Sequence, residues 1–488
     1  MALAGKVAAN TIIQVGNKII TTGINLAIIA LITRYLGKYG FGQYTTALTF
    51  VVFFSMAADL GLTLVTTQLI SRPGAHISAV MSNLFAFRAV SAFLIIGLAP
   101  LVVLLLPYDA VVKQGVGIAA LAMYFFLLCQ IFVSLFQKEL RTDRIAIAEI
   151  ISRLLILVLT IWAIATNAGV IGLLWTLTVG NVVSFLFHYL FSRRYVKTSF
   201  RFDKKVWIDI ISRSWPLIIT IVLNLVYLKA DILILSFFKS QADVGLYGAA
   251  YRVVDVLVTI PFMIGGTILP IFAARWLSND RENFKRIWQR VFDVSAIIAW
   301  PLVIGGFVLA QPIMNLISGP GFEPAGSILK ILIIAVGFIF FSSFFSYTMV
   351  SFDHQRKLIF AYLLTAATSL ILYLILIPKF SYYAAAWVTV YSELLISILA
   401  WWVVRRYSQL HLSFKRFSKA LLSALLMGLV LNLFVGVPET LLNVFILIGG
   451  GILVYFVVLY GLQGVSKQDV IELLPASFNQ PKSFSKKA

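Results

Sequence analysis

Stretches of about 20 apolar residues recur along almost the whole chain, and this feature most restricts the possible fold. A helix of that length spans the ~30 Å hydrocarbon core of a bilayer. Inside that core every backbone polar group needs a partner within the protein, which limits spanning segments to helices or closed barrels. The chain is 61% hydrophobic and 12% charged, whereas soluble domains carry about 25% charged residues. The sequence therefore predicts an all-α, polytopic membrane protein.

The apolar stretches divide into fourteen predicted transmembrane helices. They lie at about residues 8–33, 42–66, 80–106, 115–136, 145–166, 169–191, 215–237, 244–270, 291–313, 327–350, 358–377, 383–404, 419–436 and 442–462.

The distribution of basic residues predicts how these helices are oriented. With the N-terminus on the inner side, the inner segments hold 28 of the 39 Lys and Arg residues, and the outer loops hold 5. Lys and Arg are enriched in the cytoplasmic loops of membrane proteins, so both termini are expected in the cytoplasm. Attraction to anionic lipid headgroups then explains the net charge of +20, and nucleic acid is not an expected partner.

One short pattern occurs twice, as LGKYGFGQYTTA from Leu36 and as ADVGLYGAAYRV from Ala242. Its central glycines, Gly42 and Gly245, begin the second and eighth predicted helices and lie 203 residues apart. The pattern therefore relates helices one to six with helices seven to twelve. Because six is even, both halves enter the membrane from the same side, and the sequence predicts a parallel pseudo-two-fold repeat. A chance match within a low-complexity apolar chain is the alternative.

The predicted organisation follows from this repeat and from the helix positions. It comprises an N-lobe of six helices (1–191), a basic cytoplasmic linker (192–214), a C-lobe of six helices (215–404), two extra helices (405–462) and a cytoplasmic tail (463–488).

The sequence offers no evident place for catalysis. The outer loops are short, and the four histidines share no metal-ligand spacing. Cys129 is the single cysteine, so one chain cannot form a disulfide. There is no HExxH, Gly-x-Ser-x-Gly or P-loop motif. We expect a protein that is not an enzyme and that holds no metal or cofactor, apart from a coupling H⁺ or Na⁺.

The first predicted helix carries a polar face about 100° wide. It is formed by Asn10, Gln14, Asn17, Lys18, Thr21 and Asn25. At 1.5 Å per residue this face is roughly 22 Å long, which is most of the hydrocarbon thickness. Unpaired polar groups cannot face lipid at an acceptable free energy, so the face must contact other helices or water. It either lines a substrate-binding cavity or makes interhelical hydrogen bonds.

Two further predicted helices carry similar polar faces. On the seventh helix these residues are Thr220, Asn224, Tyr227 and Asp231, and on the eighth they are Tyr251, Arg252, Asp255 and Thr259. Lys229 projects from the opposite face of the seventh helix, toward the outer interface. Three polar faces on corresponding helices favour a shared hydrated cavity, with Asn224, Tyr251 and Arg252 among its substrate-binding residues.

Three acidic residues within predicted spans are candidates for ion coupling. They are Asp231, Asp255 and Glu393. Ionisable groups at membrane depth are costly to bury and are functional candidates by default. Each could carry H⁺ or Na⁺.

Several motifs resemble a known family. They are the Asn-rich first helix, the LGKYGFGQY turn, ADLGL at 58–62 and VGLYGAAYR at 244–252. Together they are similar to the polysaccharide transporter family, which belongs to the multidrug/oligosaccharidyl-lipid/polysaccharide exporter superfamily and includes O-antigen flippases. Fourteen helices rather than twelve resemble the lipid II flippase branch and several polysaccharide exporters, which leaves the subfamily open.

The resemblance implies a function and partners. It implies alternating access between two six-helix lobes in a bacterial or archaeal plasma membrane. The substrate would be an undecaprenyl-pyrophosphate-linked oligosaccharide, moved from the inner to the outer leaflet for surface polysaccharide biosynthesis. Lys18 and Arg252 would contact its pyrophosphate. Membrane lipids and polysaccharide polymerase machinery are further expected partners.

Two other functions stay open at this point. A cation-coupled multidrug exporter of the drug-extrusion type would carry a net negative site for organic cations. A scaffold within a polysaccharide assembly complex would not need its cavity charges.

Overall fold

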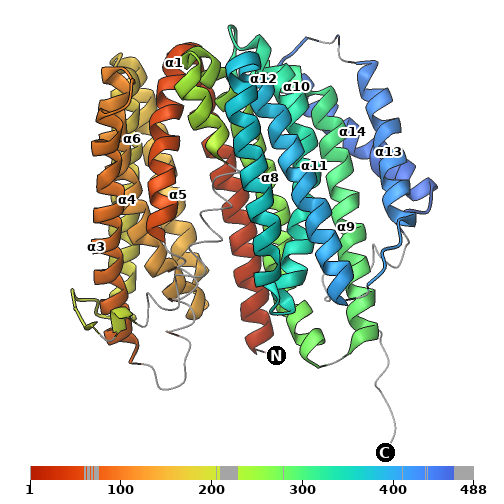
Figure 1. Ribbon diagram of the computed structural model, residues 1–488, viewed down its shortest axis with the longest axis horizontal. Helices are drawn as coiled ribbons and strands as arrows, with labels where there is room; N and C mark the ends of the chain where they lie inside the picture. Colours follow the sequence, from red (N-terminus) through yellow and green to blue (C-terminus); the bar gives the residue numbers. More distant parts are fainter. Residues whose placement is uncertain are drawn as a thin grey trace, which may run out of the picture. The chain divides into compact units, whose positions relative to one another are not determined.

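The computed structural model consists of helices. It describes residues 2–59, 76–204, 206–208, 229–278, 280–408, 410–434 and 438–465, together with residues 62, 66, 70 and 436. The described helices are α1 (Ala2–Asp59), α3 (Ile77–Leu104), α4 (Ala110–Lys138), α5 (Thr142–Ala165), α6 (Gly169–Ser192), α8 (Gln241–Leu277), α9 (Arg281–Val308), α10 (Ala310–Ser318), α11 (Glu323–Ser351), a 3-10 turn η1 (Gln355–Leu358), α12 (Ile359–Ser408), α13 (Lys415–Asn432) and α14 (Leu441–Gly461) (Figure 1). The described residues contain no strand, and the predicted all-α class is confirmed.

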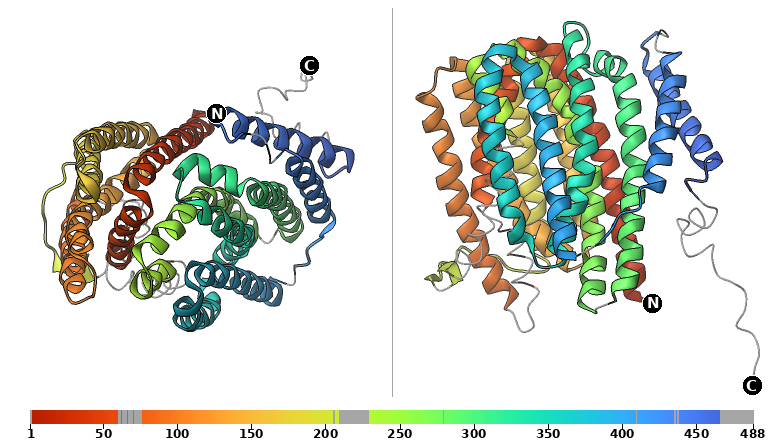
Figure 2. Two further views of the ribbon diagram at one scale, coloured as in Figure 1. Left: turned by 90° about the horizontal axis from the view of Figure 1, so that it is seen from above. Right: turned by 45° about the vertical axis from the view of Figure 1, so that its right-hand side comes forward.

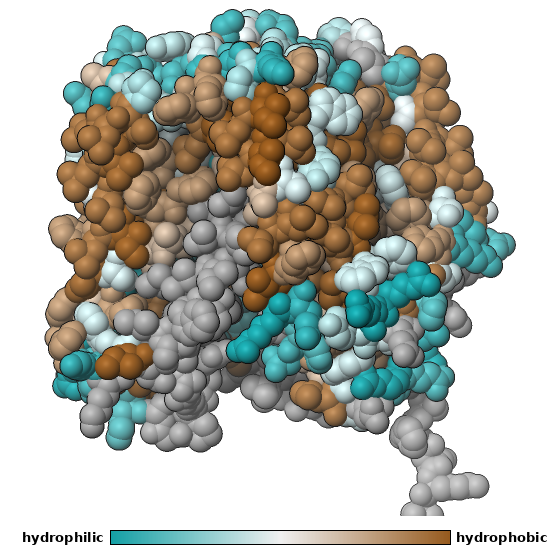
Figure 3. Space-filling view, viewed as in Figure 1, coloured by the Kyte–Doolittle hydropathy of each residue, from teal (hydrophilic) through white to brown (hydrophobic). Residues whose placement is uncertain are grey.

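Ten of the described helices are long and apolar enough to cross a membrane. Large apolar side chains such as Phe93, Leu101 and Phe445 are more than half exposed on them. Hydrophobic residues cover the sides of the helices, and hydrophilic residues gather toward their ends (Figure 3). Such a surface suits lipid rather than water, because lipid imposes no cost on exposed hydrocarbon. The protein is therefore a multi-pass membrane protein.

Two of the long helices each contain a break that separates two predicted spans. In α1 the break is Gly37, with φ 62° and ψ −179°, a conformation open to glycine because it lacks a Cβ atom. In α12 it is Ser381, with φ 51°, three residues after Pro378. The residues before and after Gly37 are called here the first and second arms of α1. The two arms meet at this break (Figure 1).

The seventh predicted span is described only in part. Residues 229–238 are helical, whereas Asn224, Thr220 and Tyr227 lie outside the described residues. The number of fourteen spans, the lobe boundaries and the full repeat stay predictions.

The chain divides into two compact units. Unit 1 comprises Met1–Leu257, Met314–Leu332 and Arg356–Ile396. Within it, α4 packs against α3, α6 and α1, and α5 packs against α1 and α6. An aromatic and aliphatic core formed by Met81, Ile131, Phe132, Leu135 and Phe136 joins α3 with α4.

Unit 2 comprises Val258–Ile313, Ile333–Gln355 and Ser397–Ala488. In it, α13 packs against α9 and α14, and both views of Figure 2 show α13 and α14 (blue) side by side. Met427 and Leu431 of α13 pack against Tyr455 and Leu459 of α14. The Tyr455 hydroxyl donates a hydrogen bond of 2.8 Å to the Ile297 carbonyl of α9, which satisfies a polar group in an apolar core.

The second arm of α1 crosses the start of α8 at very short range, within unit 1. A Cβ atom at Gly42 would lie 1.7 Å from the carbonyl oxygen of Gln241, and one at Gly245 would lie 1.9 Å from the carbonyl oxygen of Lys38. Lys38 and Gln241 are separated by the same 203 residues as Gly42 and Gly245. The two contacts are therefore reciprocal, as a two-fold axis requires of a shared interface. This crossing explains why the chain repeats its glycine junction.

We expect Gly42→Ala and Gly245→Ala each to destabilise the protein by at least the ~1–3 kcal/mol typical of overpacking, because the obstructing atoms belong to rigid backbone. Thermal unfolding of the purified protein measures this effect. Gly23→Ala is the matched control, because a Cβ atom there meets nothing within 4 Å. Equal unfolding temperatures for Gly42→Ala and Gly23→Ala would contradict the described crossing.

Candidate functional site

A cavity of about 90 Å³ lies next to this crossing, between the second arm of α1 and the first turns of α8. We call it the α1–α8 cavity. It is lined by Thr45, Leu48, Thr49, Val52, Met123, Lys229, Ile232, Gly248, Tyr251, Arg252 and Asp255. All of these residues belong to unit 1.

Three charged side chains line the α1–α8 cavity and contact one another. Lys229 Nζ lies 2.9 Å from Asp255 Oδ1, and Arg252 Nη1 lies 3.7 Å from Asp255 Oδ2. Their side chains are 25%, 28% and 38% exposed for Lys229, Arg252 and Asp255, so the charges reach open space rather than a sealed core. Two cations against one carboxylate give this group a net positive charge.

Aromatic residues flank the charged group. The Lys229 ammonium lies 4.2 Å from the centre of the Tyr251 ring, within the range of a cation–π interaction. On the α1 side, the buried Tyr44 hydroxyl interacts electrostatically with Arg252 and also with Arg153 of α5. Arg153 and Arg252 therefore both lie near Tyr44.

The lining residues of α1 and α8 occupy corresponding positions of the predicted 203-residue repeat. Leu48 and Tyr251, Thr49 and Arg252, and Val52 and Asp255 are each separated by 203 residues, as are Thr45 and Gly248. The first member of each pair is uncharged. The predicted repeat thus supplies matching lining positions, and α8 supplies the charged members of these pairs, Arg252 and Asp255.

A second polar cluster surrounds Asp231, which is fully buried. The Tyr247 hydroxyl donates a hydrogen bond of 2.5 Å to Asp231 Oδ2, and the Thr389 hydroxyl lies 3.4 Å from the same oxygen. The Ile232 backbone N–H donates to Asp231 Oδ1 at 2.7 Å. The hydroxyl of Tyr373 lies 3.3 Å from that of Thr389. A carboxylate with nearby hydroxyl oxygens can hold a proton or a hard cation, because both bind oxygen ligands.

Glu393 lies one helical turn after Thr389 on α12 and is 2% exposed. It interacts electrostatically with Tyr251 and Tyr373, which places it near the Asp231 cluster. Among the described residues, no three His, Cys, Asp or Glu side chains are grouped so that they could hold a metal ion.

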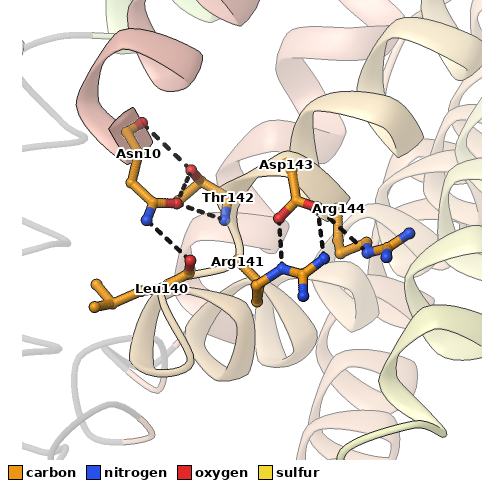
Figure 4. Close-up of polar contacts among 6 residues, drawn as sticks. All are labelled: Asn10, Leu140, Arg141, Thr142, Asp143 and Arg144. Atoms are coloured by element: carbon orange, nitrogen blue, oxygen red, sulfur yellow. Dashed lines mark hydrogen bonds and ion pairs between the residues drawn. The ribbon is translucent and has the colours of Figure 1, made fainter. Parts of the chain in front are cut away.

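On the first arm of α1, Asn10 makes interhelical hydrogen bonds. Its Nδ2 donates to the Leu140 carbonyl at 2.9 Å, and its Oδ1 accepts from the Thr142 backbone N–H at 3.0 Å and from the Thr142 hydroxyl (Figure 4). Beside this contact, Asp143 pairs with Arg141 at 2.9 Å and with Arg144 at 3.4 Å. Asn10 therefore fixes the first arm of α1 to the start of α5.

Asn17, which lies about two helical turns after Asn10 on α1, makes a similar contact with α5. Its Nδ2 donates to Glu149 Oε2 of α5 at 2.6 Å. Thr21 is buried and donates to the Asn17 carbonyl at 2.8 Å. For Asn10 and Asn17 the structure thus shows the interhelical hydrogen bonding that was the alternative to a cavity.

The remaining polar residues of the first predicted helix differ in their exposure. Gln14 and Lys18 are exposed and Asn25 is half-buried. None of the first-helix candidates lines the α1–α8 cavity, whereas Tyr251 and Arg252 do. The structure therefore brings Arg252, Tyr251 and Asp255 together and does not place Lys18 with them. A role for Lys18, Gln14, Asn17, Thr21 and Asn25 in binding substrate stays a prediction.

Sequence reasoning placed Lys229 away from the site, toward the outer interface. The structure places its ammonium in the α1–α8 cavity, on Asp255 and Tyr251. Lys229 and Asp231 do lie on different faces, as expected, but it is the lysine that faces the cavity and the aspartate that is buried. A signal was available in the sequence, because a lysine within an apolar span needs an anionic partner and Asp255 lies on the next helix.

The size of the α1–α8 cavity limits what it can hold. Liquid water occupies about 30 Å³ per molecule, so about 90 Å³ holds roughly three waters. Sites for organic ligands typically measure about 300–1,000 Å³. The cavity must therefore widen before a large headgroup can enter.

A family model described as "Polysaccharide biosynthesis protein" matches residues 7–276. The chain is 23% identical over 461 residues to the "Probable low-salt glycan biosynthesis flippase Agl15" of Haloferax volcanii, covering 91% of this chain and 96% of the relative. It is 24% identical over 325 residues to the "Succinoglycan biosynthesis transport protein ExoT" of Rhizobium meliloti. That second match covers 65% of this chain and 64% of the relative, so the chain spans just under two thirds of that relative's length.

Among solved structures, the chain resembles "Lipid II flippase MurJ, inward closed conformation", with a TM-score of 0.77. The match covers 95% of this chain and all of that chain at 18% identity. Identity this low supports the shared fold alone.

Proposed function

Because the chain belongs to the polysaccharide biosynthesis protein family, we propose that it is a flippase for a lipid-linked oligosaccharide. The substrate carries an undecaprenyl-pyrophosphate anchor and moves from the inner to the outer leaflet for surface polysaccharide biosynthesis. The family assignment confirms the resemblance seen in the sequence, and relatives named as flippase and transporter support the proposal. Substrate identity and direction are the proposed parts.

The observation that carries the proposal is the net positive group in the α1–α8 cavity. Lys229 and Arg252 share Asp255, and all three are partly exposed within helices of a membrane protein. Charges at such depth are costly and are kept where they contact a substrate or a water-filled path. Arginine and lysine bind phosphate oxygens through charge-assisted hydrogen bonds.

The substrate explains why a polar passage is needed. Each sugar hydroxyl that enters hydrocarbon without a partner costs about 4–8 kcal/mol on the water-to-cyclohexane scale, so a glycan headgroup cannot cross lipid alone. Outward movement of its negative charge runs with an inside-negative potential, worth about 2.3 kcal/mol per charge per 100 mV. The polyprenyl chain can remain in lipid throughout.

The charged group in the α1–α8 cavity also disfavours the alternative function, an exporter of organic cations. Two cations against one carboxylate repel a cationic substrate, and the described cavity adds no second acidic residue. A scaffold without transport activity makes the opposite prediction for the cavity variants described next.

We expect Arg252→Ala and Lys229→Ala each to lower glycan-lipid transport at least about tenfold, because a hydrogen bond to a charged group contributes about 1.5–3 kcal/mol. Deletion of the gene from its host should leave complete lipid-linked repeat units on the inner leaflet. Extraction of lipid-linked glycans, with a test of their accessibility from outside, measures both effects.

Lys113→Ala is the control, because it removes a basic residue outside the cavity. Lys18→Ala decides whether the first arm of α1 takes part in binding. Normal export by both cavity variants, at normal protein levels, would favour a scaffold. Unchanged glycans with altered dye efflux would favour the drug exporter.

We propose that the chain lies in the plasma membrane with both termini in the cytoplasm. Ser278 and Glu439 are exposed in segments expected on opposite sides, and the single cysteine, Cys129, is buried. An impermeant maleimide added to intact cells should label the Glu439→Cys variant and leave Ser278→Cys unlabelled until the cells are opened. The reverse pattern would invert the orientation and the direction of transport.

We further propose that Asp231 binds the coupling H⁺ or Na⁺. Its carboxylate is fully buried and faces the hydroxyls of Tyr247 and Thr389. Asp255 pairs with two cations, whereas the partners described above for Asp231 are hydroxyl and N–H groups, so we take Asp231 as the coupling residue ahead of Asp255 and Glu393.

Asp231→Asn should abolish the response of transport to an imposed Na⁺ or pH gradient, because the amide keeps the shape and loses the charge. Flipping of a fluorescent pyrophosphate lipid in proteoliposomes measures that response. Asp280→Asn, at the N-cap of α9, is the control for a general change of charge. A gradient response that survives Asp231→Asn would shift the assignment to Glu393 or Asp255.

A further inference from the structure

Asp255 is the one acidic residue among those that line the described α1–α8 cavity, and it holds both of the cavity's cations. Each carboxylate oxygen takes one partner: Oδ1 lies 2.9 Å from Lys229 Nζ and Oδ2 lies 3.7 Å from Arg252 Nη1. The carboxylate therefore bridges the two cations. Phosphate groups bridge neighbouring cations in the same way, through two oxygens on one centre.

The bridge is not the tight, dehydrated kind that serves stability. The three side chains are between 25% and 38% exposed, and the Arg252 contact is longer than a hydrogen bond. Exposed ion pairs of this kind contribute little to stability. Because these ion pairs are weak and open to the cavity, another anion can replace the Asp255 carboxylate.

Lys229 is held in place independently of Asp255. Its ammonium lies 4.2 Å from the centre of the Tyr251 ring, and Tyr251 is 5% exposed. The cation therefore keeps a second contact when its carboxylate partner leaves. Removing Asp255 should leave Lys229 facing the cavity rather than releasing it.

From these contacts we propose that Asp255 is an internal counter-ion. It occupies the position of the substrate's anionic group in the empty cavity and is displaced when a pyrophosphate binds. This inference rests on the proposed function and assigns a specificity role within the same site. A pyrophosphate carries more negative charge than one carboxylate or one monophosphate and offers oxygens on two phosphorus centres, so it gains more by replacing the carboxylate than a monophosphate headgroup does.

Displacement of Asp255 also affects release of the product. A displaced Asp255 remains close to the bound anion and repels it, so Asp255 weakens binding and favours departure of the product. A purely structural salt bridge has the opposite consequence, because its loss would disorder Lys229 and Arg252 and weaken anion binding. The sign of the change in affinity therefore distinguishes the two roles.

The test uses the full-length protein in nanodiscs and measures binding of farnesyl pyrophosphate and farnesyl monophosphate. Asp255→Asn should bind the pyrophosphate about tenfold more tightly than the wild type. It should also discriminate less between the two probes. The unfolding temperature of each variant shows whether it is folded.

Asp243→Asn is the matched control. It makes the same substitution on the same helix, but Asp243 lies outside the cavity and accepts a hydrogen bond from the Ser240 hydroxyl at 2.9 Å. We expect its affinity for both probes to equal that of the wild type. A gain shared by both variants would mean that net charge, rather than the counter-ion, sets affinity, and would overturn the inference.

Equal or weaker pyrophosphate binding by folded Asp255→Asn would also overturn the inference. That outcome leaves the proposed function intact if the wild type binds pyrophosphate and the deletion strain accumulates glycan lipid on the inner leaflet. If deletion leaves the glycan lipids unchanged, the proposed function fails whatever the affinities show. Folded Asp255→Glu keeps the negative charge and should discriminate between the pyrophosphate and monophosphate probes as the wild type does.

Discussion

Hydrocarbon offers no hydrogen-bond partners, and this constraint organises the polar groups of the whole molecule. Asn10 bonds to Leu140 and Thr142, Asn17 bonds to Glu149, and Asp231 accepts from Tyr247. In each case a polar side chain on one helix fixes its position against another. The groups in the α1–α8 cavity differ, because they are charged side chains that line an open space although their charges are paired.

The crossing of α1 and α8 relates this site to the repeat in the sequence. Gly42 lies against Gln241 and Gly245 lies against Lys38, so neither glycine can gain a side chain without moving the other helix. Just beyond the crossing, corresponding positions line the cavity with Thr49 and Val52 on α1 and with Arg252 and Asp255 on α8. Corresponding positions of the predicted repeat thus carry an asymmetric charge pattern. Close packing explains the glycine in both copies, whereas the charged members of these pairs lie on α8 alone.

The sequence predicted much of the fold and part of the site, and the division has a physical cause. Apolar length fixes where a helix can span, so the all-α membrane class and the breaks near Gly37 and Ser381 follow from composition and turn residues. Helical periodicity predicts Arg252, Asp255 and Tyr251 on one face, and all three line the α1–α8 cavity. It could not tell whether a polar face meets water or another helix: Asn10 and Asn17 on that face bond to α5 and its preceding turn, and a role for Asn17 in binding substrate stays a prediction. It also could not show that Lys229 reaches Asp255, because that contact depends on how two helices pack.

The small size of the cavity and its internal ion pairs have a common explanation. Each of the two cations in the cavity has to be hydrated or paired. Placing Asp255 between Lys229 and Arg252 satisfies both cations while the space holds only about three waters. A ligand that displaces the carboxylate must also separate α1 from α8 around it, so anion exchange and widening are coupled in one event. The backbone contacts at Gly42 and Gly245 hold α1 against α8 at the end of the cavity that adjoins the crossing.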